Sequence, residues 1–479
     1  MAEWMNPMSE LLDVSVEWMD RWWDPEAGLL WNMDGSFDEI GPPRSIHLVP
    51  QSAWYVAGLL FRAAPGDEER AVRTIEALLA CQYDDPGTVW HGTFARFLET
   101  PYPKSDAIMW FDYDPNWRQF IGTTFEFLLQ EGQPGRTLDA ALQTRLRASI
   151  ELAITGEPLD RVPPSYSNIA LMRAWLEVEH GRPGAEDYAA QIVELFDEHG
   201  AFEEYNSATY YGIDLYALAL WRDRSSSSML RDAGARIEAA LWRDVSRWYH
   251  PDMRNLCGPW SRSYGMDMRR YVSLLGMWMW PAIGQSAAPL PDVASGRPFE
   301  HAHDLSNGPL AAVLRPVVPD DVDLLAFGSE HSVTQRITST ETTDRVATGW
   351  LSERVMCGGE TGTLGASARG QYHPATVHWA LPDGDVGWIR LVHYAPARAV
   401  ASAGALAITC LPSVKRGPVA PELWVYSPGG LSVTGRTWTL PGLDVEVAAG
   451  FDDLAGDGNL WKVRFPVGTE DLSLRFSAT

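Results

Sequence analysis

The sequence is poor in cysteine and in positive charge, and it lacks any apolar run long enough to cross a membrane. Four cysteines occur, and no two of them form a C-x-x-C pair: Cys81, Cys257, Cys357 and Cys410. This spacing favours buried free thiols in a reducing compartment over disulfides or a zinc site. The N-terminus also lacks the basic and apolar regions of a secretory signal. Since a transmembrane helix needs roughly 20 apolar residues, these features predict a cytoplasmic protein.

Positive charge is scarce relative to negative charge. The chain has 38 Lys and Arg against 63 Asp and Glu, for a net charge of −25. This balance repels nucleic-acid phosphates and anionic membrane surfaces. We therefore expect neither nucleic acid nor a membrane as a partner, and the few cations near any site become informative.

Several common functional motifs are also missing. The sequence contains no G-x-x-x-x-G-K-[ST], no G-x-G-x-x-G after a strand, no H-E-x-x-H and no G-x-S-x-G. Nucleotide-binding, dinucleotide-binding, zincin and serine-hydrolase functions therefore lack their usual signals. No residue spacing argues for a metal, and no cofactor is predicted.

Tryptophan, by contrast, is abundant. The chain has 22 tryptophans, most of them in the first 280 residues. A tryptophan buries a large apolar surface but brings an N–H group that needs a partner. Core packing accounts for part of this number, and the remainder suggests flat platforms that stack on sugar rings.

Up to about residue 284 the apolar residues recur at intervals of three and four, which predicts helices. Ten segments show this period: 8–23, 51–64, 68–82, 118–132, 138–154, 167–181, 185–200, 212–223, 230–249 and 266–280. Short polar loops alternate with long aromatic loops between them. Helical hairpins with function-rich loops at one end predict an (α/α) toroid whose long loops gather around a cleft.

The composition changes at residues 281–298, and after this stretch the period of the apolar residues falls to two. The alternation is clear at 460–466 and 472–479, and P-D-G-D at 382–385 predicts a turn. We therefore predict an α+β multidomain protein. Its parts are an (α/α) toroid over 1–284, a linker over 285–299 and an antiparallel β-sandwich over 300–479.

Polar and aromatic side chains concentrate in loops between the predicted helices. They supply His47 and Gln51 (with Arg44 nearby), Trp90 and His91, Asp112, Asp114 and Trp117, Glu204, Asn206, Tyr210 and Tyr211, and Trp260, Arg262 and Tyr264. Some of these residues have structural explanations as well. Asp114 in D-P-N-W fits a helix N-cap, and single histidines such as His47 and His91 are more often structural than catalytic.

One reaction uses most of these groups together. Breaking a 4-linked uronate by β-elimination requires a neutraliser for the carboxylate, a base for the C5 proton and an acid for the leaving O4. Amides, histidines and arginines suit the first task. A tyrosine phenol suits the other two if nearby cations lower its pKa from about 10. The set that meets these needs is Asn206, His91, Arg262 and Tyr264, with the other loop residues binding substrate.

This layout resembles the polysaccharide lyases that join an (α/α) toroid to an antiparallel β-sandwich, the chondroitin AC, alginate and heparinase II/III lyase-like superfamily. The resemblance implies a cleft that uses Asn, His, Tyr and Arg, and it extends here to Asn206, His91, Tyr264 and Arg262. The sequence differs in having no secretion signal and in being shorter than many such lyases. Both differences favour an oligosaccharide or glycoside over an intact polymer as the substrate.

Two other functions remain open. A glycoside hydrolase needs two carboxylates, about 5 Å apart for retention or about 6.5–9.5 Å for inversion. Asp112 or Asp114 with Glu203 or Glu204 are the candidates. A non-catalytic carbohydrate-binding protein would need no such chemistry. The sequence leaves homo-oligomerisation open.

Overall fold

The computed structural model describes residues 7–33, 46–295, 299–339, 345–362, 365–367, 370–415 and 417–479. Arg44 and residues 296–298 of the predicted linker lie outside these ranges. The chain divides into two compact units. Unit 1 comprises Met1–Val193, Gly212–Ala239 and Arg270–Val318, and unit 2 comprises Glu194–Tyr211, Ala240–Arg269 and Pro319–Thr479.

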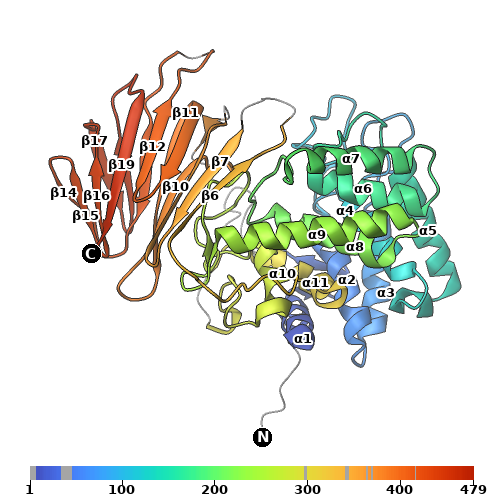
Figure 1. The fold of residues 1–479 in the computed structure, drawn as a ribbon. Helices are drawn as coiled ribbons and strands as arrows, with labels where there is room; N and C mark the ends of the chain where they lie inside the picture. The colour runs from blue at the N-terminus through green and yellow to red at the C-terminus, as the bar shows by residue number, and fades with distance from the viewer. Residues whose placement is uncertain are drawn as a thin grey trace, which may run out of the picture. The chain divides into compact units, whose positions relative to one another are not determined.

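Eleven α-helices form within the described residues (Figure 1). They are α1 (Pro7–Asp20), α2 (Val49–Arg62), α3 (Asp67–Ala80), α4 (Trp117–Leu129), α5 (Ala140–Thr155), α6 (Ser167–Glu179), α7 (Ala185–His199), α8 (Tyr210–Arg224), α9 (Ser228–Trp248), α10 (Leu274–Ile283) and α11 (Gly308–Leu314). Three short 3-10 helices join them: η1 (Pro134–Thr137), η2 (Val293–Ser295) and η3 (Ala302–Asn307). Each of the ten helices predicted from the three-and-four period is present.

Capping side chains explain where some of these helices begin. Asp139 precedes α5 and accepts hydrogen bonds from the N–H groups of Ala141 and Leu142. Ser273 does the same for α10 by accepting from Gly276 N–H. The apolar period had predicted a start at residue 266. The Ser273 cap explains why α10 begins at Leu274 instead.

Within unit 1, α2 packs against α3 and α4, and α4 packs against α5 and α6. This packing agrees with helical hairpins, and closure into a toroid stays a prediction. Helix α11 falls in the part of the chain where only strands were predicted. A proline near its first turn and the buried Leu310 and Leu314 account for this short helix.

Most strands belong to one antiparallel sheet of unit 2, which contains fourteen strands among the described residues. They are β6 (His331–Arg336), β7 (Val346–Leu351), β8 (Val355–Glu360), β9 (Gly365–Ala366), β10 (Ala375–Ala380), β11 (Val386–Ser402), β12 (Ala405–Cys410), β13 (Glu422–Tyr426), β14 (Ser432–Thr434), β15 (Thr437–Leu440), β16 (Leu443–Val447), β17 (Asp453–Asp457), β18 (Leu460–Arg464) and β19 (Asp471–Ala478). Five short strands lie earlier: β1 (Trp23–Asp24), β2 (Leu29–Trp31), β3 (His47–Leu48), β4 (Tyr249–His250) and β5 (Asn255–Leu256).

The long strand β11 connects two parts of this sheet. Its first part pairs with β10 and β13, and its last residues pair with β12. Its pairing with β9 shifts register between His393 and Pro396, as at a β-bulge. Side chains from both parts, such as Val377 and Ile408, share one buried hydrophobic cluster. The cluster is compatible with two facing layers, and the sandwich stays a prediction.

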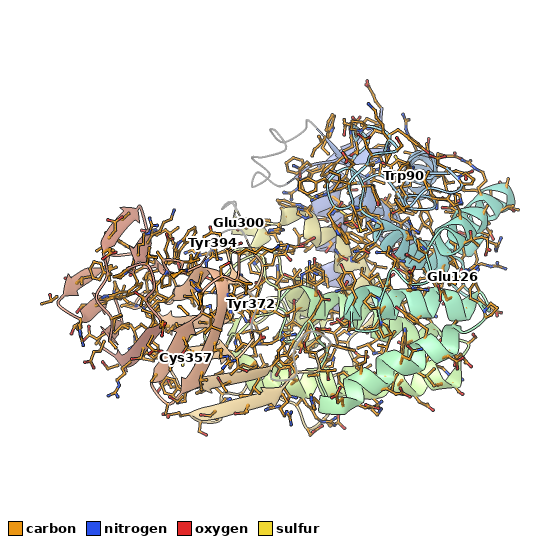
Figure 2. All side chains as sticks on the ribbon, turned by 90° about the horizontal axis from the view of Figure 1, so that it is seen from above. Trp90, Glu126, Glu300, Cys357, Tyr372 and Tyr394 are labelled. Atoms are coloured by element: carbon orange, nitrogen blue, oxygen red, sulfur yellow. The ribbon has the colours of Figure 1, made fainter. Side chains whose placement is uncertain are left out.

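Several local predictions are confirmed. The P-D-G-D segment forms the turn between β10 and β11, where Gly384 N–H donates to Leu381 C=O. All four cysteines are buried and free, among them Cys357 on β8 (Figure 2). In the described part of the chain, no helix combines the length and apolarity that a bilayer crossing requires.

The predicted domain boundaries stay a prediction. The two compact units are each made of several separate segments of the chain. Unit 2 combines the strand region with two segments from the helical half, 194–211 and 240–269. These two segments contain Glu204, Asn206, Arg262 and Tyr264. The residues proposed for chemistry around Arg262 therefore belong to the same unit as the sheet.

Candidate functional site

The candidate site in unit 2 is built on three chain segments held together by backbone and hydroxyl hydrogen bonds. Trp260 N–H donates to His373 C=O and His373 N–H donates back to Trp260 C=O. The Ser207 hydroxyl donates to Arg262 C=O at 2.6 Å and accepts from Tyr210 N–H at 2.8 Å. The side chains of Tyr210 and Arg262 therefore project from fixed positions.

The Arg262 guanidinium is the centre of this site. Its Nη1 donates to Glu204 Oε1 at 2.6 Å, its Nε to Gln371 Oε1 at 2.9 Å and its Nη2 to Tyr210 OH at 2.7 Å. The guanidinium carbon also lies 3.8 Å from the centroid of the Tyr210 ring. Burial alone would lower the pKa of Arg262, but Tyr210 and Glu204 raise it above its usual value. Arg262 is therefore a fixed cation.

Two tyrosine hydroxyls extend the network away from Arg262. Tyr210 OH and Tyr264 OH lie 3.0 Å apart. Because a guanidinium only donates, the Tyr210 oxygen accepts from Arg262, and its own proton is available to Tyr264. Tyr264 is half-buried, and its hydroxyl extends this chain of hydrogen bonds beyond Tyr210.

Tyr210 keeps its proton in this site. Burial and the neighbouring Tyr264 raise the pKa of Tyr210 well above its usual value, although Arg262 opposes the shift. Burial therefore outweighs the guanidinium at Tyr210. A permanently protonated Tyr210 is a hydrogen-bond donor, which a phenolate on Tyr264 would need.

Asn206 lies inside unit 2, with its side chain wholly buried. Its amide nitrogen donates to Cys257 C=O and to Pro259 C=O, both at 2.8 Å. Its backbone is in the left-handed region, at φ 49°, which asparagine adopts more readily than most residues. We therefore assign Asn206 to holding the turn that carries Arg262, in place of the predicted contact with substrate.

Two other aromatic candidates of unit 2 are also core residues. Trp260 is fully buried, with its ring 5.1 Å from the ring of His378. Tyr211 is fully buried, with its hydroxyl 3.4 Å from Asp244 Oδ2. Neither ring presents a face to solvent, so neither is a platform for a sugar.

The candidates in unit 1 have mainly structural surroundings. His47 is buried, with Nδ1 2.6 Å from Glu99 Oε1 and Nε2 3.0 Å from Asp24 Oδ2. The Trp31 ring stacks on the His47 ring at 3.7 Å. Gln51 is buried in α2. Both ring nitrogens of His47 are occupied by carboxylates, which suits an ion-paired structural histidine.

His91 and Trp90 fix the long loop ahead of α4. The Nδ1 atom of His91 accepts from Asp85 N–H at 3.1 Å. Trp90 is buried, with its ring 5.8 Å from the ring of Tyr113 (Figure 2). His91 belongs to unit 1, whereas Arg262 and Tyr264 belong to unit 2.

Asp112 and Asp114, in the loop that precedes α4, accept hydrogen bonds from their own loop. Asp112 Oδ2 accepts from Ile108 N–H at 2.7 Å, and Asp114 Oδ1 accepts from Asn116 N–H at 2.9 Å. Asn116 is the N-cap residue of α4, so the N-cap interpretation of Asp114 is wrong, and Asp114 instead holds the turn that leads into this helix. Trp117 is half-buried, and its ring lies 5.3 Å from that of Phe120.

Exposed aromatic faces lie elsewhere in the same loop. Trp110 is 53% exposed and Phe111 is 87% exposed. Asp112 and Asp114 of this loop were predicted to be functional, and these two rings were not. Their position in an aromatic loop between helices was the available signal.

A second polar network in unit 1 also escaped sequence reasoning. Glu157 accepts from Arg161 Nε at 2.5 Å and from Gln119 Nε2 at 2.5 Å. Arg161 Nη1 donates to Asn116 Oδ1 at 2.9 Å, and Asn116 Nδ2 donates to Tyr166 OH at 3.0 Å. The four-residue spacing of Glu157 and Arg161 was a weak signal, because their other partners lie some 40 positions away along the chain.

The described residues also contain a group with the chemistry to hold a metal ion, His301, His303 and Asp304 of unit 1. The sequence analysis singled out no metal ligands. The signal was the H-A-H-D run at 301–304, which contains three ligand-bearing side chains in four residues.

Comparisons with known proteins give two family matches. A family model described as Domain of unknown function (DUF8769) matches residues 9–316, and one described as Domain of unknown function (DUF8770) matches residues 329–455. No curated protein matches the chain.

Solved structures give only slight likenesses. Two crystal structures of endoglucanase CelQ from Clostridium thermocellum, complexed with cellotetraose and with cellotriose, align at 11% sequence identity with TM-scores of 0.27 and 0.28. Each alignment covers 99% of this chain and 93% of that chain. TM-scores this low carry no argument about this protein.

Proposed function

This chain belongs to the family of the domain of unknown function DUF8769, and from the Arg262 network of its unit 2 we propose that it is a carbohydrate-active lyase. The substrate is a uronic-acid-containing oligosaccharide or glycoside, cleaved by β-elimination. One observation carries the proposal: hydrogen bonds join the half-buried Tyr264 hydroxyl through Tyr210 to the Arg262 cation.

In this proposal Arg262 binds the substrate carboxylate. Neutralising that carboxylate makes the adjacent C5–H more acidic. Arg262 already holds Glu204 at 2.6 Å, so the substrate carboxylate competes with Glu204 for the guanidinium. Since Arg262 is 28% exposed, an anion from solvent can reach it.

Tyr264 moves the proton. As a phenolate it accepts the C5 proton, the C5–H electrons form the C4=C5 double bond, and the C4–O4 bond breaks. The protonated Tyr264 then donates this proton to O4, which restores the phenolate. Tyr210 donates a hydrogen bond to the Tyr264 oxygen throughout, and Arg262 strengthens that bond by donating to Tyr210.

An oligosaccharide substrate also suits the exposed rings of unit 1. Trp110 and Phe111 present flat apolar faces to solvent. Such faces stack on the C–H-rich sides of sugar rings, and this stacking buries apolar surface of both rings. These two rings therefore support a sugar ligand without identifying the reaction.

The test is incubation with a panel of uronic-acid oligosaccharides and glucuronides. We expect the near-UV absorbance of a conjugated C4=C5 product without the mass of an added water. Tyr264→Phe should lower the rate at least about 100-fold, because it removes the proton-transferring group. Its free energy of unfolding should fall by only about 1 kcal/mol, the contribution of one hydrogen bond.

Tyr394→Phe is the matched control, since Tyr394 is a 49% exposed tyrosine on β11 of the same unit (Figure 2). This variant should retain the wild-type rate. A product that has gained water and shows no absorbance would mean hydrolysis, and the assignment to Tyr264 would be wrong. Binding without any product would mean a carbohydrate-binding protein.

A further inference from the structure

His301, His303 and Asp304 extend from a segment of unit 1 that is anchored at several points. Glu300 N–H donates to Arg270 C=O, and Val272 N–H donates to Glu300 C=O, both at 3.0 Å. The neighbouring Phe299 ring lies 5.3 Å from the ring of Trp18 on α1. Helix η3, which follows His301, packs against α1, α2, α10 and α11. The three side chains therefore project from a backbone that its neighbours hold in place.

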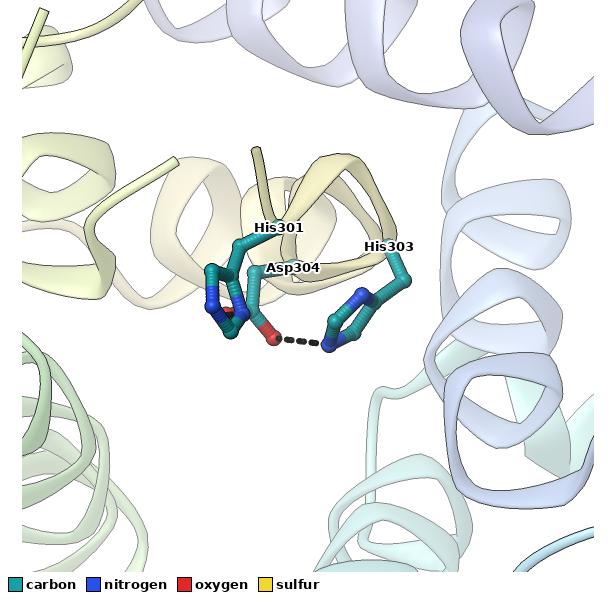
Figure 3. Close-up of side chains that lie close together, drawn as sticks. All are labelled: His301, His303 and Asp304. Carbon is teal, nitrogen blue, oxygen red and sulfur yellow. Dashed lines mark ion pairs between the residues drawn. The ribbon is translucent and has the colours of Figure 1, made fainter. Parts of the chain in front are cut away.

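The three side chains converge on one point. His303 Nε2 lies 3.4 Å from Asp304 Oδ1, and His301 Nδ1 lies 3.9 Å from Asp304 Oδ2. One ligand atom from each residue lies within 4.8 Å of the other two. Figure 3 shows the Asp304 carboxylate between the two imidazole rings. All three side chains are largely buried, with exposed fractions of 10–18%.

These distances suit a shared cation better than direct ion pairs. A charge-assisted contact between an imidazolium and a carboxylate is about 2.7–2.9 Å long. His180 makes such a contact at 3.0 Å, with Glu126. By comparison, a tetrahedral ion with bonds of about 2.0–2.1 Å separates its ligand atoms by about 3.3–3.4 Å. The His303–Asp304 distance of 3.4 Å already equals this separation, and the three ligand atoms, which lie within 4.8 Å of one another, must draw closer around an ion.

The backbone at His301 supports the same interpretation. His301 is in the left-handed region at φ 55°, and its side chain does not cap the helix that it precedes. Non-glycine residues adopt this region only uncommonly. With this backbone, His301 Nδ1 lies 3.9 Å from Asp304 Oδ2.

We propose that His301, His303 and Asp304 form a binding site for one divalent first-row transition-metal ion. Two imidazoles and one carboxylate suit Zn²⁺, Co²⁺ or Fe²⁺, and imidazole disfavours Mg²⁺ and Ca²⁺. Three protein ligands leave at least one coordination position for water or another ligand. The site belongs to unit 1, whereas the proton-transfer network belongs to unit 2.

The test uses the full chain, treated with a chelator and dialysed, and Co²⁺ alone as the probe. We expect one Co²⁺ to bind per chain and to give the visible absorption of a Co²⁺–imidazole complex. This absorption should disappear when added Zn²⁺ displaces the Co²⁺. His303→Ala and Asp304→Asn should each weaken Co²⁺ binding at least about 100-fold, because each removes a direct ligand. Far-UV circular dichroism of each variant checks that it folds.

His180→Gln is the matched control. His180 also lies between two carboxylates, Glu126 at 3.0 Å and Glu151 at 3.8 Å, but these approach opposite ring nitrogens and cannot share one ion. This variant should bind Co²⁺ as the wild type does. The proposal is overturned if the wild type binds no Co²⁺ or Zn²⁺. Asp304→Asn is the second decisive variant, since it keeps the shape of the side chain, and undiminished binding by this folded variant would also overturn it.

Discussion

Two networks of this protein use the same residue types in different ways. In unit 1, Glu157 accepts hydrogen bonds from Arg161 and Gln119, and Arg161 also donates to Asn116. In unit 2, Arg262 binds Glu204 and Gln371 and continues to Tyr210 and Tyr264. Each network joins an arginine, a glutamate, an amide and a tyrosine. Their residue types alone would assign them the same role.

The difference lies in burial and in how the hydrogen bonds are filled. The Glu157 side chain is 2% exposed, and its oxygens accept from the buried Gln119 and from Arg161, whose side chain is 12% exposed. The Arg262 side chain is 28% exposed, and its network includes the half-buried Tyr264 hydroxyl. A closed network holds its unit together, because no anion from solvent can reach it. An open one can exchange a partner or a proton with a ligand.

The largest expected effect comes from removing one charge of the closed network. Glu157→Gln leaves Arg161, and the fully buried Arg118 3.8 Å away, without a neutralising partner. Burial lowers the pKa of Arg118 to about 10, which shows how little solvent supports this charge. We expect a loss of about 3–5 kcal/mol in the free energy of unfolding. Denaturant unfolding followed by tryptophan fluorescence measures it.

Glu204→Gln is the matching change in the open network, and it should cost only about 1 kcal/mol because Arg262 can turn to water. Glu76→Gln provides a baseline near zero, since Glu76 and its partner Arg145 are about half exposed. Equal losses for Glu157→Gln and Glu204→Gln would contradict the distinction between a closed and an open network.

A smaller effect should appear when the pH falls. His373 and His378 lie under the open network in unit 2, and His373 Nε2 is 3.2 Å from Ser263 C=O, between Arg262 and Tyr264. Burial lowers the pKa of His378 from 6.5 to about 4, and burial with the nearby Arg390 lowers that of His373 to about 3. Between these folded-state pKa values and 6.5, the two histidines are protonated in the unfolded chain and neutral in the folded chain. The free energy of unfolding therefore falls as the pH drops from about 6.5 to about 4.

For His378 the loss amounts to on the order of 3 kcal/mol. Hydrogen exchange read by mass spectrometry should show unit 2 peptides losing protection at pH 5 before unit 1 peptides. His378→Gln should flatten the pH dependence in unit 2. Loss of protection in both units at the same pH would count against this assignment.

A loss smaller than that expected for His378 separates support from chemistry within unit 2. Asn206→Ala removes two buried hydrogen bonds to Cys257 C=O and Pro259 C=O. It also places alanine at φ 49°. We expect a loss of about 2 kcal/mol in the free energy of unfolding. In the activity assay the folded fraction should keep its KM. A raised KM with unchanged stability would instead return Asn206 to the substrate-binding set.

Sequence patterns predicted the local structure well. The three-and-four period located helices such as α5 and α7, and the two-residue period located β18 and β19. The loops between the predicted helices also contained most residues of the open network. Glu204 and Tyr210 lie close together along the chain, as do Arg262 and Tyr264. The distinction between Arg262 and Asn206 was not predictable, since both are polar residues in loops and only packing buries Asn206.

The sequence by itself determined the helices, the strands and the sparse, buried cysteines, because these depend on the period and type of neighbouring residues. Only the tertiary structure decided which polar groups are closed in and which reach solvent. It brought Arg161 to Asn116, Gln371 to Arg262 and Asp304 between His301 and His303. Burial and partner distance set the charge, pKa and accessibility of a side chain, and both depend on residues remote along the chain or on the exact course of the backbone.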